Sequence, residues 1–344
     1  MTKRLEYIDI AKGLCILLVV MGHILQFNSI GHASQTVFNF IYSFHMPVFM
    51  LLSGFVATLS RDNIDRTVMT FVRKKFVSLV IPFLTWGLFI MPIVVYRKDF
   101  FSLPTIAKDL ILQPDTGAWF IISLFCIQIY YLLFCCLAKF SKKWMTPLSA
   151  ECFSIIVVLS VLFISQKIMS SSCPSLPGGV KFYMPEKYIL FFFLGYVFNR
   201  YLIKIIFDKR TLCISSFVFV LIVRYYTFGN DPYYLQVSCG ILASIIVLNI
   251  AKAIEQNIVL DSYKRNMIIY GKNSLIIYLT HFPIVMLLQK GVCVNTDFIA
   301  GIPLFIIAAI VSVPICKICT LWGEIVSENS IFSLLLYGTI KKKE

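Results

Sequence analysis

Long apolar segments recur along this chain of 344 residues and limit its possible folds more than any other feature. Each runs for about 20 residues, the length that an α-helix needs to cross the hydrocarbon core of a membrane. Charged residues make up 14% of the chain, compared with roughly 25% in soluble domains. The sequence therefore predicts an all-α polytopic membrane protein with about ten transmembrane helices. The predicted spans are residues 10–29, 37–59, 77–96, 118–138, 150–167, 187–206, 211–228, 234–252, 267–288 and 298–322.

The positions of the basic residues predict the orientation of these spans. The formal net charge is +14, with 31 Lys and Arg. A cytoplasmic N-terminus places most of them in inner segments, as the positive-inside rule requires. Both termini are then cytoplasmic, in a multi-pass protein of the cell inner or plasma membrane. Because topology accounts for the charge, we expect membrane lipids as surroundings and no nucleic-acid partner; the oligomeric state stays open.

Three of the four histidines, His23, His45 and His281, lie inside predicted spans. An ionisable side chain in hydrocarbon is costly and marks a functional site by default. At about 1.5 Å per residue, His23 and His281 lie ~20 and ~21 Å from the inner face, and His45 lies ~12 Å from the outer face. The alternative is that each ring packs separately with its own hydrogen bond. The shared level favours one site in the outer half of the membrane.

Imidazole is suited to general-base catalysis near neutral pH. A site at this level fits a reaction between a cytoplasmic donor and an acceptor outside. Four basic residues line the cytoplasmic approach, namely Lys12, Arg73, Lys74 and Lys75. Lys and Arg are the usual ligands of phosphate, so the cluster predicts a phosphate-bearing donor. Positive-inside topology alone would also produce such a cluster, and the two interpretations stay open.

Four short motifs follow one another along the chain. They are YIDIAKG at residues 7–13 with Gly22-His23, FHMP at 44–47 with Ser53-Gly54, Trp119-Phe120, and Asn273-Ser274-Leu275 with Tyr278 and His281. Together they resemble the acyltransferase-3 family of integral membrane acyltransferases, and within it the fucose 4-O-acetylase-like branch. The resemblance covers roughly residues 4–325, which we take as one transmembrane domain, and residues 326–344 form a C-terminal tail.

This resemblance implies transfer of an acyl group, commonly acetyl from acetyl-CoA, to carbohydrate at the outer face. The acceptor would be a surface polysaccharide or its lipid-linked precursor. His23 matches the family's histidine, with His281 and His45 beside it, and Lys12 matches a position where Arg is commoner. Lys12 keeps the charge but loses the bidentate fork of Arg. The remaining assignments are Arg73, Lys74 and Lys75 to the donor, and Trp119, Asn273 and Ser274 to the acceptor.

We expect His23 to remove the proton of a sugar hydroxyl as that hydroxyl attacks the thioester, and His281 and His45 to orient the acceptor or stabilise charge. An acyl-histidine intermediate is the alternative route. The rival function is a proton-coupled secondary transporter or flippase, in which intramembrane His and Lys would carry protons. We expect no metal, because most of the eleven cysteines lie within spans, where cysteine packs as a small hydrophobe.

Overall fold

The computed structural model describes residues 5–59, 68–95, 102–112, 118–172, 185–230, 232–289 and 293–339. In these residues the regular structure is helical apart from two strands of two residues each. The predicted all-α class is confirmed. The chain divides into two compact units, residues 1–56 with 194–326, and residues 57–193 with 327–344.

Seven helical segments among the described residues are long and apolar enough to cross a membrane. They are Glu6–Asn28, His32–Leu59, Val68–Ile93, Trp119–Ser141, Pro147–Ile168, Tyr233–Gln256 and Gly301–Ser327. A bent pair of helices, α14 and α15, would supply an eighth. The predicted spans 187–206 and 211–228 correspond to α10 (Pro185–Tyr201) and α12 (Lys209–Val223). These two helices reach only ~26 and ~22 Å at 1.5 Å per residue, which is short of a ~30 Å core.

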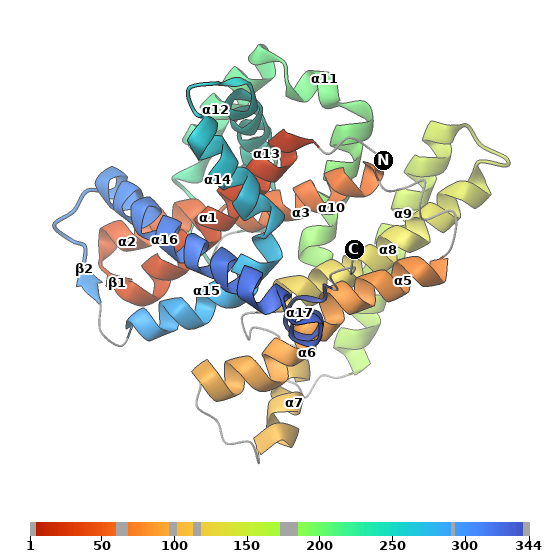
Figure 1. Ribbon diagram of the computed structural model, residues 1–344. Helices are drawn as coiled ribbons and strands as arrows, with labels where there is room; N and C mark the ends of the chain where they lie inside the picture. The colour runs from red at the N-terminus through yellow and green to blue at the C-terminus, as the bar shows by residue number, and fades with distance from the viewer. Residues whose placement is uncertain are drawn as a thin grey trace. The chain divides into compact units, whose positions relative to one another are not determined.

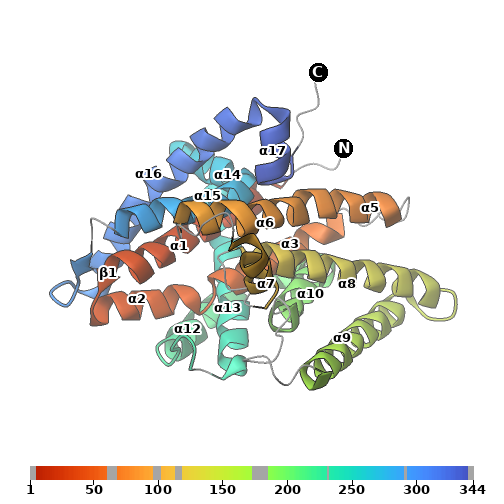
Figure 2. The same cartoon turned by 90° about the horizontal axis from the view of Figure 1, so that it is seen from below.

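The first unit contains the three predicted catalytic histidines. Its further elements are α1 (Glu6–Asn28), β1 (Ser29–Ile30), α2 (His32–Tyr42), most of α3 (His45–Leu59), the end of α10, α11 (Ile203–Ile206), α12, α13 (Tyr233–Gln256), α14 (Asp261–Lys272), α15 (Ser274–Gln289), β2 (Val294–Asn295) and α16 (Gly301–Ser327). Helix α1 packs against α2, α13, α14 and α15 (Figures 1 and 2). Most of its side chains are buried by these neighbours, so α1 is the central helix of the unit.

Two glycines bring α1 and α14 into backbone contact. A Cβ on Gly13 of α1 would meet the carbonyl oxygen of Met267 in α14, and a Cβ on Gly271 of α14 would meet the carbonyl oxygen of Asp9 in α1. No other residue fits at such an approach. Because α15 directly follows α14, this contact also sets where α15 begins beside α1.

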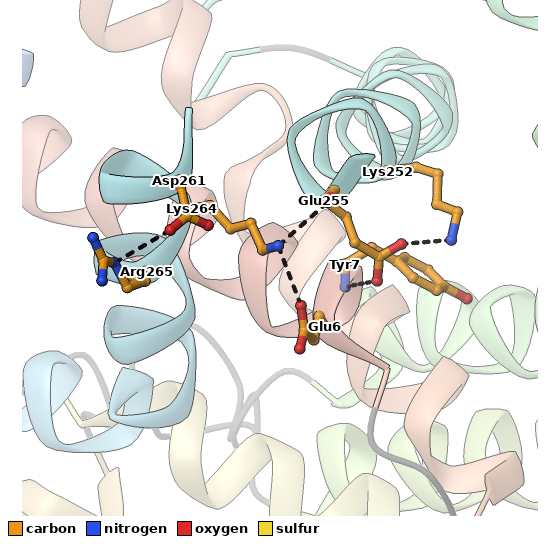
Figure 3. A network of polar contacts seen from close by, with 7 residues as sticks. All are labelled: Glu6, Tyr7, Lys252, Glu255, Asp261, Lys264 and Arg265. Atoms are coloured by element: carbon orange, nitrogen blue, oxygen red, sulfur yellow. Dashed lines mark hydrogen bonds and ion pairs between the residues drawn. The ribbon is translucent and has the colours of Figure 1, made fainter. Parts of the chain in front are cut away.

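A polar network joins the N-terminal end of α1 to α13 and α14 (Figure 3). Glu255 of α13 accepts the backbone N–H of Tyr7 at 3.1 Å and pairs with Lys252. Lys264 of α14 contacts the Glu255 carbonyl oxygen at 3.4 Å and the Glu6 carboxylate at 3.7 Å. The network therefore holds three helices together at the end of α1 that is predicted to be cytoplasmic.

The other end of α1 is held by a short parallel strand pair that the sequence did not predict. Ser29 pairs with Val294, and Ile30 pairs with Asn295. The backbone N–H of Thr296 donates to the Ile30 carbonyl at 2.8 Å. This pairing connects α1 to the segment that leads into α16.

Helices α14 and α15 meet at an angle of 86°. The break falls at Asn273, whose backbone N–H and side-chain Nδ2 both donate to the Ile269 carbonyl, at 3.0 and 3.1 Å. These bonds satisfy a carbonyl that the end of α14 leaves open. The predicted span 267–288 is therefore not one continuous helix. The depth of ~21 Å estimated for His281, which assumed a helical rise of 1.5 Å per residue throughout, does not hold.

The second unit contains Trp119 and three of the four predicted donor residues, Arg73, Lys74 and Lys75. Its elements are the end of α3, α5 (Val68–Lys75), η1 (Phe76–Val80), α6 (Ile81–Thr85), η2 (Trp86–Val95), α7 (Leu103–Leu112), α8 (Trp119–Ser141), α9 (Pro147–Ser172), the first part of α10 and α17 (Ser330–Tyr337). The segments η1 and η2 have π-helical turns. Pro82 in α6 and Pro92 in η2 each remove one backbone hydrogen bond from this helical stretch, because proline has no N–H to donate. Helix α17 lies within the predicted C-terminal tail. The indole N–H of Trp86 donates a hydrogen bond to its Leu336 carbonyl at 2.9 Å.

Candidate active site

His23 lies near the C-terminal end of α1, with its side chain half-buried. Its Nδ1 is 3.2 Å from Oε1 of Gln26, one turn further along the same helix. An amide oxygen can only accept a hydrogen bond, so Nδ1 of His23 donates. In the neutral ring, Nε2 of His23 is then the unprotonated nitrogen and the one that can take a proton.

His281 faces His23 from α15, with a distance of 5.1 Å between the ring centroids. Its side chain is 1% exposed, and its Nδ1 donates to the Ile277 carbonyl at 2.8 Å. Within the described part of the chain, Nε2 of His281 is buried and has no hydrogen-bond partner. A buried polar atom without a partner costs free energy, so it calls for a functional explanation.

His45 is the first residue of α3, and Tyr42 lies between it and His23. The ring of Tyr42 is 4.6 Å from that of His45 and 6.4 Å from that of His23. Nδ1 of His45 donates to the Ile41 carbonyl at 2.8 Å. The structure thus brings the three histidines into one region, in which Tyr42 contacts the rings of both His23 and His45.

Aromatic rings contact both members of the pair formed by His23 and His281. Phe282 meets His23 edge-on at 5.5 Å, Phe27 stacks on His23 at 5.9 Å, and Tyr278 lies 6.1 Å from His281. Apolar rings lower the local polarity, which strengthens electrostatic interactions between the groups that they contact.

Lys12 occupies the same face of α1 as His23. Eleven residues separate them, which is three helical turns to within about 20° and ~16 Å along the axis. Lys12 is half-buried. The helix therefore aligns a basic side chain near the end predicted to be cytoplasmic with the histidine near the end predicted to be outer, as their spacing in the sequence requires of a straight helix.

Asn273 and Ser274 lie at the bend between α14 and α15, where both are half-buried. The side chain of Asn273 closes the end of α14, as described above, so its position has a structural explanation. Acceptor binding by these two residues stays a prediction.

The remaining predicted site residues belong to the second unit. Arg73 and Lys74 are exposed at the end of α5, and the Lys75 ammonium lies 5.5 Å from the centroid of the Phe71 ring. Trp119 begins α8 and stacks on Tyr188 with 5.3 Å between ring centroids. Their assignments to donor and acceptor stay predictions.

Sequence reasoning missed Gln26 and Tyr42. The hydroxyl of Tyr42 donates to Oε1 of Gln26 at 3.2 Å, so this one oxygen receives both Tyr42 and His23. Gln26 could have been found, because it is a polar residue one turn after His23 on the same helix face. Tyr42 could not, because its contact depends on how α2 packs against α1. Gly22 makes room for it, since a Cβ there would lie 2.8 Å from the Tyr42 ring.

A cavity of about 280 Å³ borders α1 on a different face from the one that carries His23. Ile24, Leu25 and Asn28 of α1 line this cavity. The α1 residues of the candidate site, His23, Gln26 and Phe27, lie on the other side of the helix. Apolar residues of α16 and of the segment that leads into it line another part of the cavity. As for metals, the described ranges contain no group of three His, Cys, Asp or Glu that could hold an ion.

The fold and the site describe an α-helical membrane protein with a pair of facing histidines. Comparison with known sequences identifies its family. Residues 5–321 match the family described as an acyltransferase domain. The chain therefore belongs to the acyltransferase-3 family, which confirms the resemblance at the level of the family.

Two curated relatives match shorter segments. Nodulation protein NolL of Sinorhizobium fredii is 40% identical over 84 residues, which are 23% of this chain and 22% of the relative. Nodulation protein NolL of Mesorhizobium japonicum is 29% identical over 154 residues, which are 43% of this chain and 39% of the relative. The chain thus matches less than half the length of either relative. No solved structure matches it.

Proposed function

We propose that this protein is a membrane O-acyltransferase that moves acetyl from cytoplasmic acetyl-CoA to a sugar hydroxyl at the outer face, with His23 as the general base. The acceptor would be a surface polysaccharide or its lipid-linked precursor, in the cell inner or plasma membrane. Membership of the acyltransferase family supports the reaction class. The acetyl donor, the sugar acceptor and the fucose 4-O-acetylase-like branch rest on the sequence motifs.

One observation carries the proposal. The ring centroids of His23 and His281 lie 5.1 Å apart, and Nδ1 of each ring donates a hydrogen bond to an oxygen. Both Nε2 atoms are therefore free of protons in the neutral rings and can accept one. A general base must reach the proton that it removes by a hydrogen bond. Two such nitrogens side by side can both hydrogen-bond an attacking hydroxyl.

The proposed step balances without a covalent enzyme intermediate. The acceptor oxygen forms a bond to the thioester carbonyl carbon while Nε2 of His23 takes the hydroxyl proton. The tetrahedral intermediate then collapses with cleavage of the carbon–sulfur bond. The protonated His23 returns its proton to the leaving thiolate, which gives the ester and free CoA. His281 is placed to hydrogen-bond the acceptor or the developing charge.

The basic residues fit the donor side of this scheme. CoA carries phosphates and cannot cross lipid, so it needs a charged approach from the cytoplasm. Lys12 lies on the His23 face of α1, nearer the cytoplasmic end, and Arg73, Lys74 and Lys75 end α5. We assign these residues to the phosphates of the donor.

Purified protein in lipid nanodiscs, given radiolabelled acetyl-CoA and polysaccharide from the same membrane, tests the proposal. We expect label in the polysaccharide, released by mild base as acetate. A proton-coupled transporter or flippase would show neither transfer nor hydrolysis of acetyl-CoA, and that result would replace the enzyme by the rival function. Mass spectrometry of the labelled glycan would identify the sugar and the hydroxyl.

A further inference from the structure

The oxygen that binds Nδ1 of His23 also receives a second donor from another helix. Oε1 of Gln26 accepts from Nδ1 of His23 at 3.2 Å and from the hydroxyl of Tyr42 at 3.2 Å. Both donors reach one amide oxygen, which fixes the orientation of the Gln26 side chain. Tyr42 is itself held by Phe38, whose ring stacks on it with 3.9 Å between centroids.

From this geometry we infer that Gln26 and Tyr42 are positioning residues that set the tautomer of His23. The inference rests on the proposed function for its catalytic consequence, but the tautomer is a property of the protein alone. With the amide oxygen in place, the proton of the neutral ring resides on Nδ1, and Nε2 is the base. Without it, the ring is free to carry its proton on Nε2, and in that tautomer Nε2 cannot take the proton of the acceptor.

The contact also explains why His23 differs from the other two histidines. His281 and His45 direct Nδ1 to a backbone carbonyl four residues earlier in the chain, which side-chain substitutions leave in place. His23 uses instead the side chain of Gln26, which is exposed. The base proposed for catalysis is thus the one histidine of the three whose tautomer a single substitution can change.

Three substitutions separate the parts of this inference. Gln26→Leu removes the acceptor, whereas Gln26→Glu keeps an oxygen for both donors and adds charge. Tyr42→Phe keeps the ring but removes the second donor. Gln35→Leu is the matched control, because Gln35 is exposed on α2 and bonds within that helix to Asn39 at 3.0 Å.

The kinetic readout is kcat and the pH profile of acetyl transfer. We expect Gln26→Leu to lower kcat by about tenfold or more, the factor that one lost hydrogen bond represents, with the acetyl-CoA KM unchanged. Gln26→Glu should restore kcat and move the acid limb of the profile to higher pH, since a carboxylate stabilises the protonated ring. The titratable groups around His23 are His281 on α15, Tyr42 on α2 and His45 beyond it; Glu255 of α13 and Lys264 of α14 lie at the far end of α1.

The decisive experiment is ¹⁵N NMR of histidine-labelled full-length protein in nanodiscs, with His23 assigned by difference from His23→Asn. We expect a protonated Nδ1 and a bare Nε2 in the wild type and in Gln26→Glu and Gln35→Leu, a mixture of tautomers in Gln26→Leu, and a smaller share of the second tautomer in Tyr42→Phe. A protonated Nε2 in the wild type, or an unchanged tautomer in Gln26→Leu, would overturn the inference. Because NMR needs no turnover, absence of transfer by the wild type would count against the proposed function alone.

Discussion

His23 on α1 and His281 on α15 face each other with 5.1 Å between their ring centroids, and each directs its Nδ1 to an oxygen. The pair depends on the contact of α1 with α14, since α15 begins at the bend that ends α14. The glycines of that contact and the histidines of the site are therefore parts of one arrangement, and each can be tested separately.

Gly271→Ala should destabilise the protein, because the added methyl group would meet the Asp9 carbonyl in α1. Overpacking of this kind costs about 1–3 kcal/mol. We expect a lower Tm for the purified variant, together with reduced transfer as α15 shifts. Gly301→Ala is the control, since a Cβ there would lie 3.7 Å from a Val37 methyl, an ordinary contact. A Gly271→Ala protein as stable as Gly301→Ala would contradict the described packing.

His281→Phe should separate stability from activity. It replaces a buried Nε2 that lacks a partner in the described part of the chain with an apolar ring of similar shape. Removing such an atom relieves a desolvation cost, so we expect an equal or higher Tm. Transfer should fall by about 10²-fold or more, within the range for loss of a group that acts on protons or charge in the reaction. A variant that loses stability yet keeps its activity would show that His281 serves packing alone.

The helical class followed from the sequence, and the histidines of the candidate site could be picked out from it, but the geometry around them could not. His23, His45 and His281 stand out because ionisable groups are rare in apolar spans. The bend at Asn273 was missed because apolar residues continue on both sides of it, although Gly271 and Asn273 are both helix-ending residues. Side chains brought in from another helix, such as Tyr42, leave no periodic signal, because their contacts follow from packing between helices.

Neutralising Lys12 should weaken binding of the donor more than catalysis. We expect Lys12→Ala to raise the acetyl-CoA KM about tenfold and to make it less sensitive to salt, since phosphate attraction is screened by ions. Lys12→Arg should keep KM near that of the wild type. The triple alanine variant of Arg73, Lys74 and Lys75 should act in the same direction as Lys12→Ala.

Lys209→Ala is the matched control for these donor variants. It removes an exposed basic residue at the start of α12, on the predicted inner side and outside the cluster. If the donor variants change only the yield or the topology, with KM equal to that of Lys209→Ala, the cluster serves membrane orientation and not CoA.

The rate of acetyl transfer by purified His23→Ala tests the central claim most directly. His32→Ala is its control, because His32 is exposed and its backbone N–H, which the substitution keeps, is what bonds Asp297. We predict that His23→Ala folds and inserts normally but loses 10²–10⁴-fold in rate, roughly the contribution of one general base, while His32→Ala retains the wild-type rate. Transfer by a well-folded His23→Ala protein at a rate near that of His32→Ala would contradict the assignment of His23 as the base.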